Sequence, residues 1–385
     1  MFARLKDDTA CLPALKTGTS TVSRAAPLPL SPPQTLDTGL LGRATPDALH
    51  HGLNGRRRSD RGSSNDAERD PNGAKPGQDV PEAVYAARAR LLQLPDGRVL
   101  SWSEFGHRHG YPVVYFHSPA GSRREAALLH EAARNAGFRL IAIDRPGIGF
   151  SSFRRLRGHS ELVGDIRSLM DELGILHAGL LAWAGGGPFA LATALHMAER
   201  VSFVSLLAPA QQPRQPSGLV GRATVCVLRG LVYLRQGWLR RGLCREASRS
   251  KAPRYLRRLR ERLCYADRKQ IDNPLVYRLL VSDVREAGRQ GTRGVAQDSV
   301  MSLMAWDFDP AAVTVPVQLW QGSADTISAP CRARYLQESI PSATLHTVAR
   351  QGHFFFAHSA GEVFRSARQQ LRESRETLFS ARDSI

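Results

Sequence analysis

An apolar run followed at once by small residues is the part of this sequence best suited to chemistry. Leu180–Trp183 reads as a short strand, and Gly185–Gly187 opens a helical stretch directly after Ala184. Strand, tight turn and helix in this order are the layout of a nucleophile elbow, whose motif is G-x-S-x-G. Ala182 and Gly186 fill the outer small positions of that motif. Ala184 therefore stands where a strained φ would expose the reacting side chain.

Two further loops follow buried strands in the same way. The apolar run 113–116 leads into His117–Arg123, which reads HSPAGSR, and the run 140–143 leads into Asp144–Ser151, which reads DRPGIGFS. Ligands of open α/β sheets bind beyond the carboxyl ends of the strands. We therefore expect both loops to lie near the elbow.

With these motifs the chain resembles the α/β-hydrolase superfamily, in the branch with an H-G-x-P-G-S-R-like loop and a D-R-P-G-x-G-x-S segment. The resemblance covers about residues 87–207 and 307–371. It implies that Asp325 is the triad acid and His353 the base, because the family order along the chain is nucleophile, acid, base. It also implies that the backbone N–H groups of Ser118 and Gly185 form an oxyanion hole. We expect no cofactor and no metal ion.

The sequence departs from the family pattern at four positions. Ser118 replaces a glycine of the loop, and Ala120 replaces a proline. Ala184 has no oxygen, so it cannot attack a carbonyl or form an acyl-enzyme. Losing the serine of such a triad costs about 10⁶ in kcat, which is about 8 kcal/mol of barrier. Ala182 also replaces a motif glycine, which favours natural divergence over a single engineered change.

The predicted acid and base also have ordinary structural interpretations, and for His353 this is an ordinary loop histidine. Asp325 could be a turn or helix-capping aspartate, but the histidine at the matching downstream position favours a triad remnant. Ser118 and Ser122 are poor candidates for a replacement nucleophile, because neither lies on the elbow.

Hydrophobic patterning predicts an α/β fold with a mostly parallel central sheet, and the resemblance implies that this is the α/β-hydrolase fold with a helical lid insertion. Short apolar runs alternate with helical stretches, as in βαβ units with helices on both faces of the sheet. The alternation stops at about Pro213 and resumes at Val317. The predicted helices are 122–136, 161–173, 332–340 and one from about 361 onward.

The chain divides into five predicted segments. These are a disordered tail (1–80), the first part of the hydrolase core (81–212), a basic helical lid (213–305), the second part of the core (306–375) and a C-terminal tail (376–385). The first tail is rich in Pro, Ser, Gly and Asn, and little of it could bury enough apolar surface to offset the entropy of ordering.

Positive charge is concentrated in the lid segment, 213–305. It holds 20 Lys and Arg against 7 Asp and Glu, within a chain of net charge +18. The stretch 255–263 alternates arginines with apolar residues, which indicates an amphipathic helix with a solvated arginine face. The alternative to a solvated face is weak attraction of these arginines to an anionic membrane surface or an acidic partner. No nucleic-acid-binding motif accompanies the charge, so we expect no nucleic-acid partner.

Other features of the sequence argue against several classes of protein. The five cysteines are odd in number and lack a C-x-x-C pair, which argues against a disulfide framework or a thiolate metal site. No apolar stretch approaches about 18 residues, and the N-terminus lacks a secretory signal, so we expect a cytoplasmic protein.

Three hypotheses about function follow, in order of preference. In the first, the chain is a non-hydrolytic or strongly impaired homologue that binds a small apolar or ester-like ligand. In the second, it is an active hydrolase, lyase or cyclase that uses the Asp325–His353 pair as a general base without an acyl-enzyme. In the third, it is an interaction protein that uses the basic lid.

Overall fold

The computed structural model describes residues 88–210, 252–302 and 304–382. The predicted N-terminal tail (1–80) and the part of the lid segment before residue 252 lie outside the described residues.

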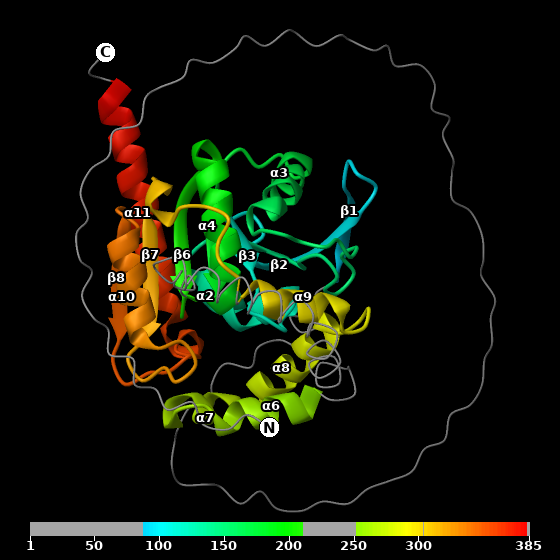
Figure 1. Cartoon of the computed structure of the whole chain (residues 1–385). Helices are drawn as coiled ribbons and strands as arrows, with labels where there is room; N and C mark the ends of the chain where they lie inside the picture. The colour runs from blue at the N-terminus through cyan, green and yellow to red at the C-terminus, as the bar shows by residue number, and fades with distance from the viewer. Residues whose placement is uncertain (1–87, 211–251, 303, 383–385) are drawn as a thin grey trace, which may run out of the picture. The chain divides into compact units, whose positions relative to one another are not determined.

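One eight-stranded sheet organises the described chain (Figure 1). Its strands are β1 (Arg90–Gln93), β2 (Val99–Gly106), β3 (Tyr111–Phe116), β4 (Phe138–Ile143), β5 (Ala178–Trp183), β6 (Val201–Leu207), β7 (Val317–Gly322) and β8 (Ala343–Val348). They lie in the order β1-β2-β4-β3-β5-β6-β7-β8. β2 is antiparallel to both of its neighbours, and the pairs from β4 to β8 are parallel. The mostly parallel sheet predicted from the sequence is confirmed.

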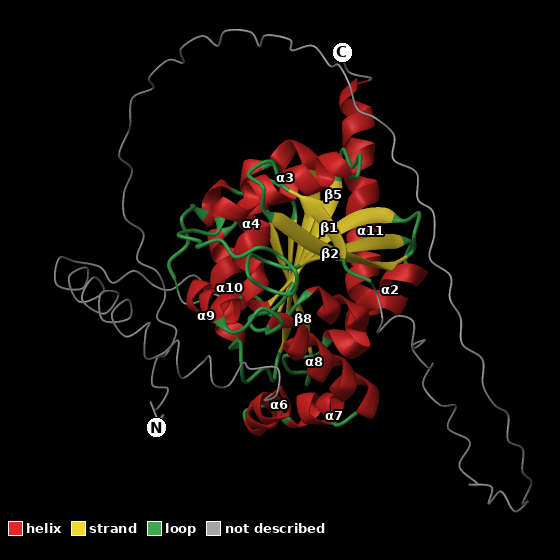
Figure 2. Cartoon of the chain, turned by 90° about the vertical axis from the view of Figure 1, so that its right-hand side faces the viewer, coloured by secondary structure: helices red, strands yellow, loops and turns green. Residues whose placement is uncertain are grey.

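Helices cover both faces of this sheet, as Figure 2 shows for α3 and α4 on one side and α2 and α11 on the other. The helices of the core are α2 (His130–Asn135), α3 (Val163–Glu172), α4 (Gly187–His196), α10 (Pro330–Ser339) and α11 (Phe356–Arg382), with short 3₁₀ turns η1 (Arg123–Leu129), η2 (Ser160–Leu162), η3 (Ala184–Gly186), η4 (Ala198–Arg200) and η6 (Pro310–Ala312). Each face of the sheet has its own hydrophobic cluster. Strands buried on both faces explain the continuous apolar runs in the sequence.

The helical stretch predicted over 122–136 is present, but its first part is the 3₁₀ helix η1 and only its second part is the α-helix α2. The Ser122 side chain caps η1 by accepting the Arg124 N–H. One predicted helix boundary is wrong. The last helix begins at Phe356 rather than near Gly361, because Phe355 and Phe356 are buried in the hydrophobic cluster below α11. It continues to Arg382, past the predicted start of a C-terminal tail at residue 376.

The described part of the lid segment is helical, as predicted. Its helices are α6 (Ala252–Glu261), α7 (Tyr265–Ile271), α8 (Pro274–Ala287) and α9 (Arg293–Met301). α8 begins with the side chain of Asn273 accepting the Leu275 N–H at 2.9 Å, a strong N-cap followed by proline at the first helical position. Leu256 and Leu279 pack in the same hydrophobic cluster as Trp183. The lid helices therefore share their apolar core with the strand that leads into the elbow.

Among the residues that the structure describes, no helix is both long enough and apolar enough to cross a membrane.

Candidate active site

The predicted elbow is present between β5 and α4. Ala184 has a φ of 49°, in the left-handed region that a non-glycine residue rarely adopts. The turn presses against the end of β3, since a Cβ placed on Gly186 would lie 2.4 Å from the Phe116 carbonyl oxygen. Strand, strained residue and helix thus have the arrangement that presents one side chain above a sheet. In this chain that side chain is a methyl group.

The predicted acid and base lie together after β7 and β8. His353 Nδ1 is 2.9 Å from Asp325 Oδ2, and both residues are buried. The other Asp325 oxygen accepts the backbone N–H groups of Ile327 and Ser328, each at 2.8 Å. Burial alone would raise the pKa of Asp325, but the hydrogen bonds from His353 and these two amides outweigh it and hold the pKa below its usual value. An ionised carboxylate therefore orients the imidazole.

Trp183 connects this pair to the elbow. Its ring packs on that of His353, with centroids 5.3 Å apart, and it directly precedes Ala184. The three positions predicted from the sequence are thus brought to one end of the sheet.

A lid residue that the sequence did not reveal holds His353 in place. Asp267 on α7 is buried and accepts the backbone N–H of His353 at 2.7 Å and that of Phe354 at 2.8 Å. Its only sequence signal is that it is one of few acids in a basic segment. The lid segment therefore contributes to the geometry of the base.

The loop predicted to supply an oxyanion donor has a different arrangement. The Ser118 N–H donates to Glu125 Oε1 at 2.7 Å, and the Ser118 hydroxyl donates to Glu125 Oε2 at 2.6 Å. Pro119 follows and has no N–H. Its ring lies against the elbow, because a Cβ on Gly185 would be 2.6 Å from Pro119 Cγ. The Ser118 amide is thus engaged by a carboxylate, and the role of the Gly185 N–H stays a prediction.

Glu125 belongs to a buried pair of carboxyl groups that sequence reasoning also missed. Asp283 on α8 accepts the Ser122 N–H at 2.9 Å and the Ser122 hydroxyl at 2.5 Å. Oxygens of both carboxyl groups flank Gly121, at 2.4 Å (Glu125) and 3.2 Å (Asp283) from the position of a Cβ there. Burial raises the pKa of Glu125 to about 7. Burial and the nearby Glu125 charge raise the pKa of Asp283 well above its usual range. The pair therefore retains a proton near neutral pH.

The arginines of the two sequence motifs join the core to the lid. Arg145 is buried, forms an ion pair with Asp298 on α9, and donates to the carbonyl oxygens of His117 and Ser118. Arg123 is buried between Asp144 at 2.5 Å and Glu286 of α8 at 2.8 Å. These two side chains therefore tie the motif loops to helices α8 and α9.

No group of three or more His, Cys, Asp or Glu side chains placed to hold a metal ion occurs in residues 88–210, 252–302 and 304–382.

Comparison with known proteins identifies the family. A model of the alpha/beta hydrolase fold matches residues 111–359. The chain is similar to an esterase from Thermogutta terrifontis (20% identity, 75% of this chain and 99% of that chain, TM-score 0.57). It is also similar to an enol-lactonase from Burkholderia xenovorans LB400 (19% identity, 74% of this chain and 100% of that chain, TM-score 0.55).

One curated relative matches over a shorter region. The dihydrolipoyllysine-residue acetyltransferase component of the acetoin cleaving system of Pseudomonas putida is 36% identical over 115 residues. That region is 30% of this chain and 31% of the relative, so the chain spans about a third of the relative's length. Because the family model extends from β3 into α11, across the elbow, the acid and the base, the chain belongs to the α/β-hydrolase-fold family.

Proposed function

We propose that this protein binds a small apolar or ester-like molecule in a hydrolase-type site and does not hydrolyse it through an acyl-enzyme. The observation that carries the proposal is Ala184 on the strained turn, at the position from which a nucleophile would act. The esterase and the enol-lactonase among the similar structures motivate the choice of an ester-like ligand.

The loop beside the elbow supports the same conclusion. An oxyanion hole needs N–H groups that point at the developing charge, and the Ser118 N–H donates to Glu125 instead. Pro119 offers no N–H of its own. Nucleophile and loop donor are thus both missing from the arrangement that acyl transfer requires.

A second function is favoured by the Asp325–His353 contact of 2.9 Å. An imidazole oriented by an ionised carboxylate can act as a general base on water or on an acidic C–H group. Such a site could catalyse a hydrolytic, lyase or cyclisation step without a covalent intermediate.

Hydrolysis of p-nitrophenyl acetate, butyrate and octanoate tests both functions. We expect the natural chain to match the uncatalysed rate and Ala184→Ser to exceed it, with His353→Ala in the serine background returning the rate to that of the natural chain. Turnover by the natural chain that disappears in His353→Ala would refute the non-hydrolytic proposal and support the general-base function.

A further inference from the structure

In the lid helices most acidic side chains are buried, whereas the basic side chains are not. Residues 252–302 contain six acidic side chains, of which Asp267, Asp283, Glu286 and Asp298 are buried against the core. The eleven Lys and Arg side chains of the same stretch include none that is buried. Outside the buried contacts, this stretch therefore has eleven basic side chains against only Glu261 and Asp272, and one of the eleven, Arg289, is partly exposed and pairs with Glu286.

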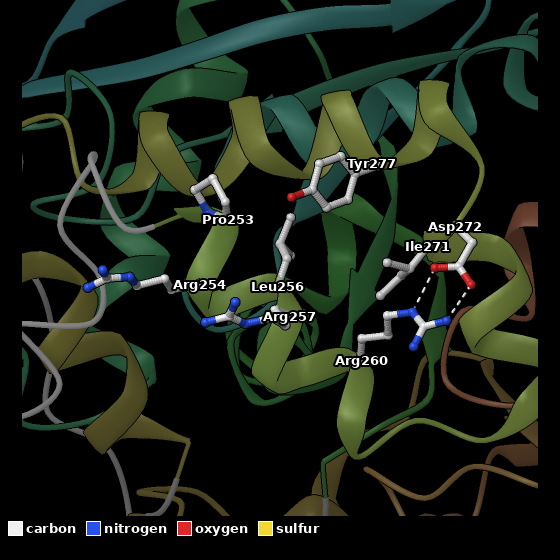
Figure 3. Close-up of a pocket in the computed structure, with 8 residues that line it drawn as sticks. All are labelled: Pro253, Arg254, Leu256, Arg257, Arg260, Ile271, Asp272 and Tyr277. Atoms are coloured by element: carbon white, nitrogen blue, oxygen red, sulfur yellow. Dashed lines mark hydrogen bonds and ion pairs between the residues drawn. The ribbon is translucent and has the colours of Figure 1, made fainter.

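A groove of about 330 Å³ lies on the surface of this stretch between α6 and α8 (Figure 3). Its apolar lining residues are Pro253 and Tyr277, which are exposed, and Leu256 and Ile271, which are buried beneath them. Figure 3 shows the guanidinium groups of Arg254 and Arg257 extending to the same side of α6. Neither pairs with a carboxylate within the described part of the chain. One end of the groove thus carries two guanidinium groups that have no carboxylate partner among the described residues, beside the exposed ring of Tyr277.

A second groove continues from the first. It is lined by Arg260, Tyr265, Arg268, Lys269, Asp272 and Asn273. The two grooves share the ion pair of Arg260 with Asp272, which neutralises both partners. Tyr265 is 84% exposed beside Arg268 and Lys269. An exposed tyrosine among basic groups suits the headgroup layer of a membrane, where its ring meets apolar material and its hydroxyl meets water.

We propose that the outer face of α6 and α7, formed by these two grooves, docks on anionic phospholipid membranes. Phosphate groups of the lipid would contact Arg254 and Arg257, and Tyr265 would enter the interfacial layer. α6 already packs its apolar side chains Ala252 and Leu256 against the core. Attachment would therefore be peripheral, electrostatic in its main part and sensitive to salt. This docking does not depend on whether the site turns over a ligand.

Vesicle co-sedimentation with the full chain tests the proposal. We expect binding to phosphatidylcholine vesicles that contain phosphatidylglycerol, release by added salt, and no binding to vesicles of phosphatidylcholine alone. Arg254→Glu with Arg257→Glu should lower the bound-to-free ratio by at least about tenfold, since each basic group near the surface contributes about 1 kcal/mol. Tyr265→Ser should lower it a few-fold and leave most of the salt dependence.

The matched control reverses the same number of charges elsewhere. Arg332 and Arg334 are exposed on α10 and line neither groove, so Arg332→Glu with Arg334→Glu should retain most of the binding. A circular-dichroism melt of each variant verifies folding. Equal losses in the two double variants, no binding at low salt, or tighter capture of an RNA or DNA oligonucleotide through the same arginines would overturn the proposal.

Discussion

The candidate site has two sides that are built from different loops, the acid–base side with Asp325 and His353 and the nucleophile side with Ala184 and Ser118. Only the acid–base side has the side chains that the family motif predicts. On the first side, Asp325 and His353 lie 2.9 Å apart with the carboxylate ionised. On the second, the turn carries only the methyl group of Ala184, and the Ser118 amide is occupied by Glu125.

This difference teaches that the pair does not need a nucleophile to keep its geometry. Asp325 is fixed by the amides of Ile327 and Ser328, and the backbone of His353 is fixed by Asp267. Local structure and the lid are therefore sufficient to hold the acid–base pair, so its geometry fits both proposed functions.

The test with the largest expected effect places a serine hydroxyl on the elbow at position 184. Loss of a triad serine costs about 10⁶ in kcat, and loss of one oxyanion donor costs about 10²–10³. Ala184→Ser should therefore raise ester hydrolysis by only about 10³–10⁴ over the natural chain, measured as kcat on p-nitrophenyl butyrate. A gain near the full 10⁶ would mean that the oxyanion donors are functional. The proposed difference between the two sides of the site would then be wrong.

The second test removes the lid carboxylate that anchors the loop side. Asp298→Ala leaves the guanidinium of Arg145 buried without its partner, which typically costs about 3–5 kcal/mol. Urea denaturation should show a loss of that size. Glu199→Ala is the control, because Glu199 is exposed and its loss should change stability by no more than about 0.5 kcal/mol. Similar stability in both variants would mean that the Arg145 contact does not hold the loop.

The third test returns an N–H group to the loop. In the Ala184→Ser background, Pro119→Gly should raise kcat by about 10–100-fold. This is somewhat less than the change in kcat that one well-placed oxyanion donor produces. Pro119→Ala also restores the N–H but without the flexibility of glycine, and should give a comparable gain. A gain confined to the glycine variant would assign the effect to loop mobility instead.

The smallest test concerns the buried carboxyl pair. Because the pKa of Glu125 is raised to about 7 in the folded chain, its contribution to stability is fully present below the unfolded value near 4.5 and is lost as pH rises through 7. Between pH 5 and 8 the free energy of unfolding of the natural chain should fall by on the order of 2 kcal/mol relative to that of Glu125→Gln. The fall is measured as a decrease in melting temperature relative to the variant.

The difference between the two proteins is the quantity to measure in that test. His117 is buried beside Arg145 and its pKa is lowered, so it acts in the opposite direction over part of the same range and cancels in the difference. Parallel pH profiles for the two proteins would show that Glu125 keeps its ordinary titration.

Features formed by neighbouring residues could be predicted from the sequence, whereas contacts between residues far apart along the chain could not. The elbow was predictable because Leu180–Gly187 contains strand, turn and helix in adjacent residues, and Asp325 and His353 each follow their own strand. The Ser122–Asp283 and His353–Asp267 contacts join residues 161 and 86 positions apart. No local pattern encodes them, because they depend on how the lid helices pack on the core. The early start of α11 was missed for a similar reason, since tertiary burial of Phe355 and Phe356 extends the helix.

The four buried carboxylates of the lid also bear on how fast a ligand can enter and leave. Lifting α7, α8 and α9 together would break the contacts of Asp267, Asp283, Glu286 and Asp298 at once and expose Arg123 and Arg145. Because such an opening would separate several buried charged side chains from their partners, it has a high free energy and is rarely populated. Amide hydrogens of these three helices should therefore exchange slowly, and a ligand of the proposed kind would have to enter by a route that leaves these helices in place.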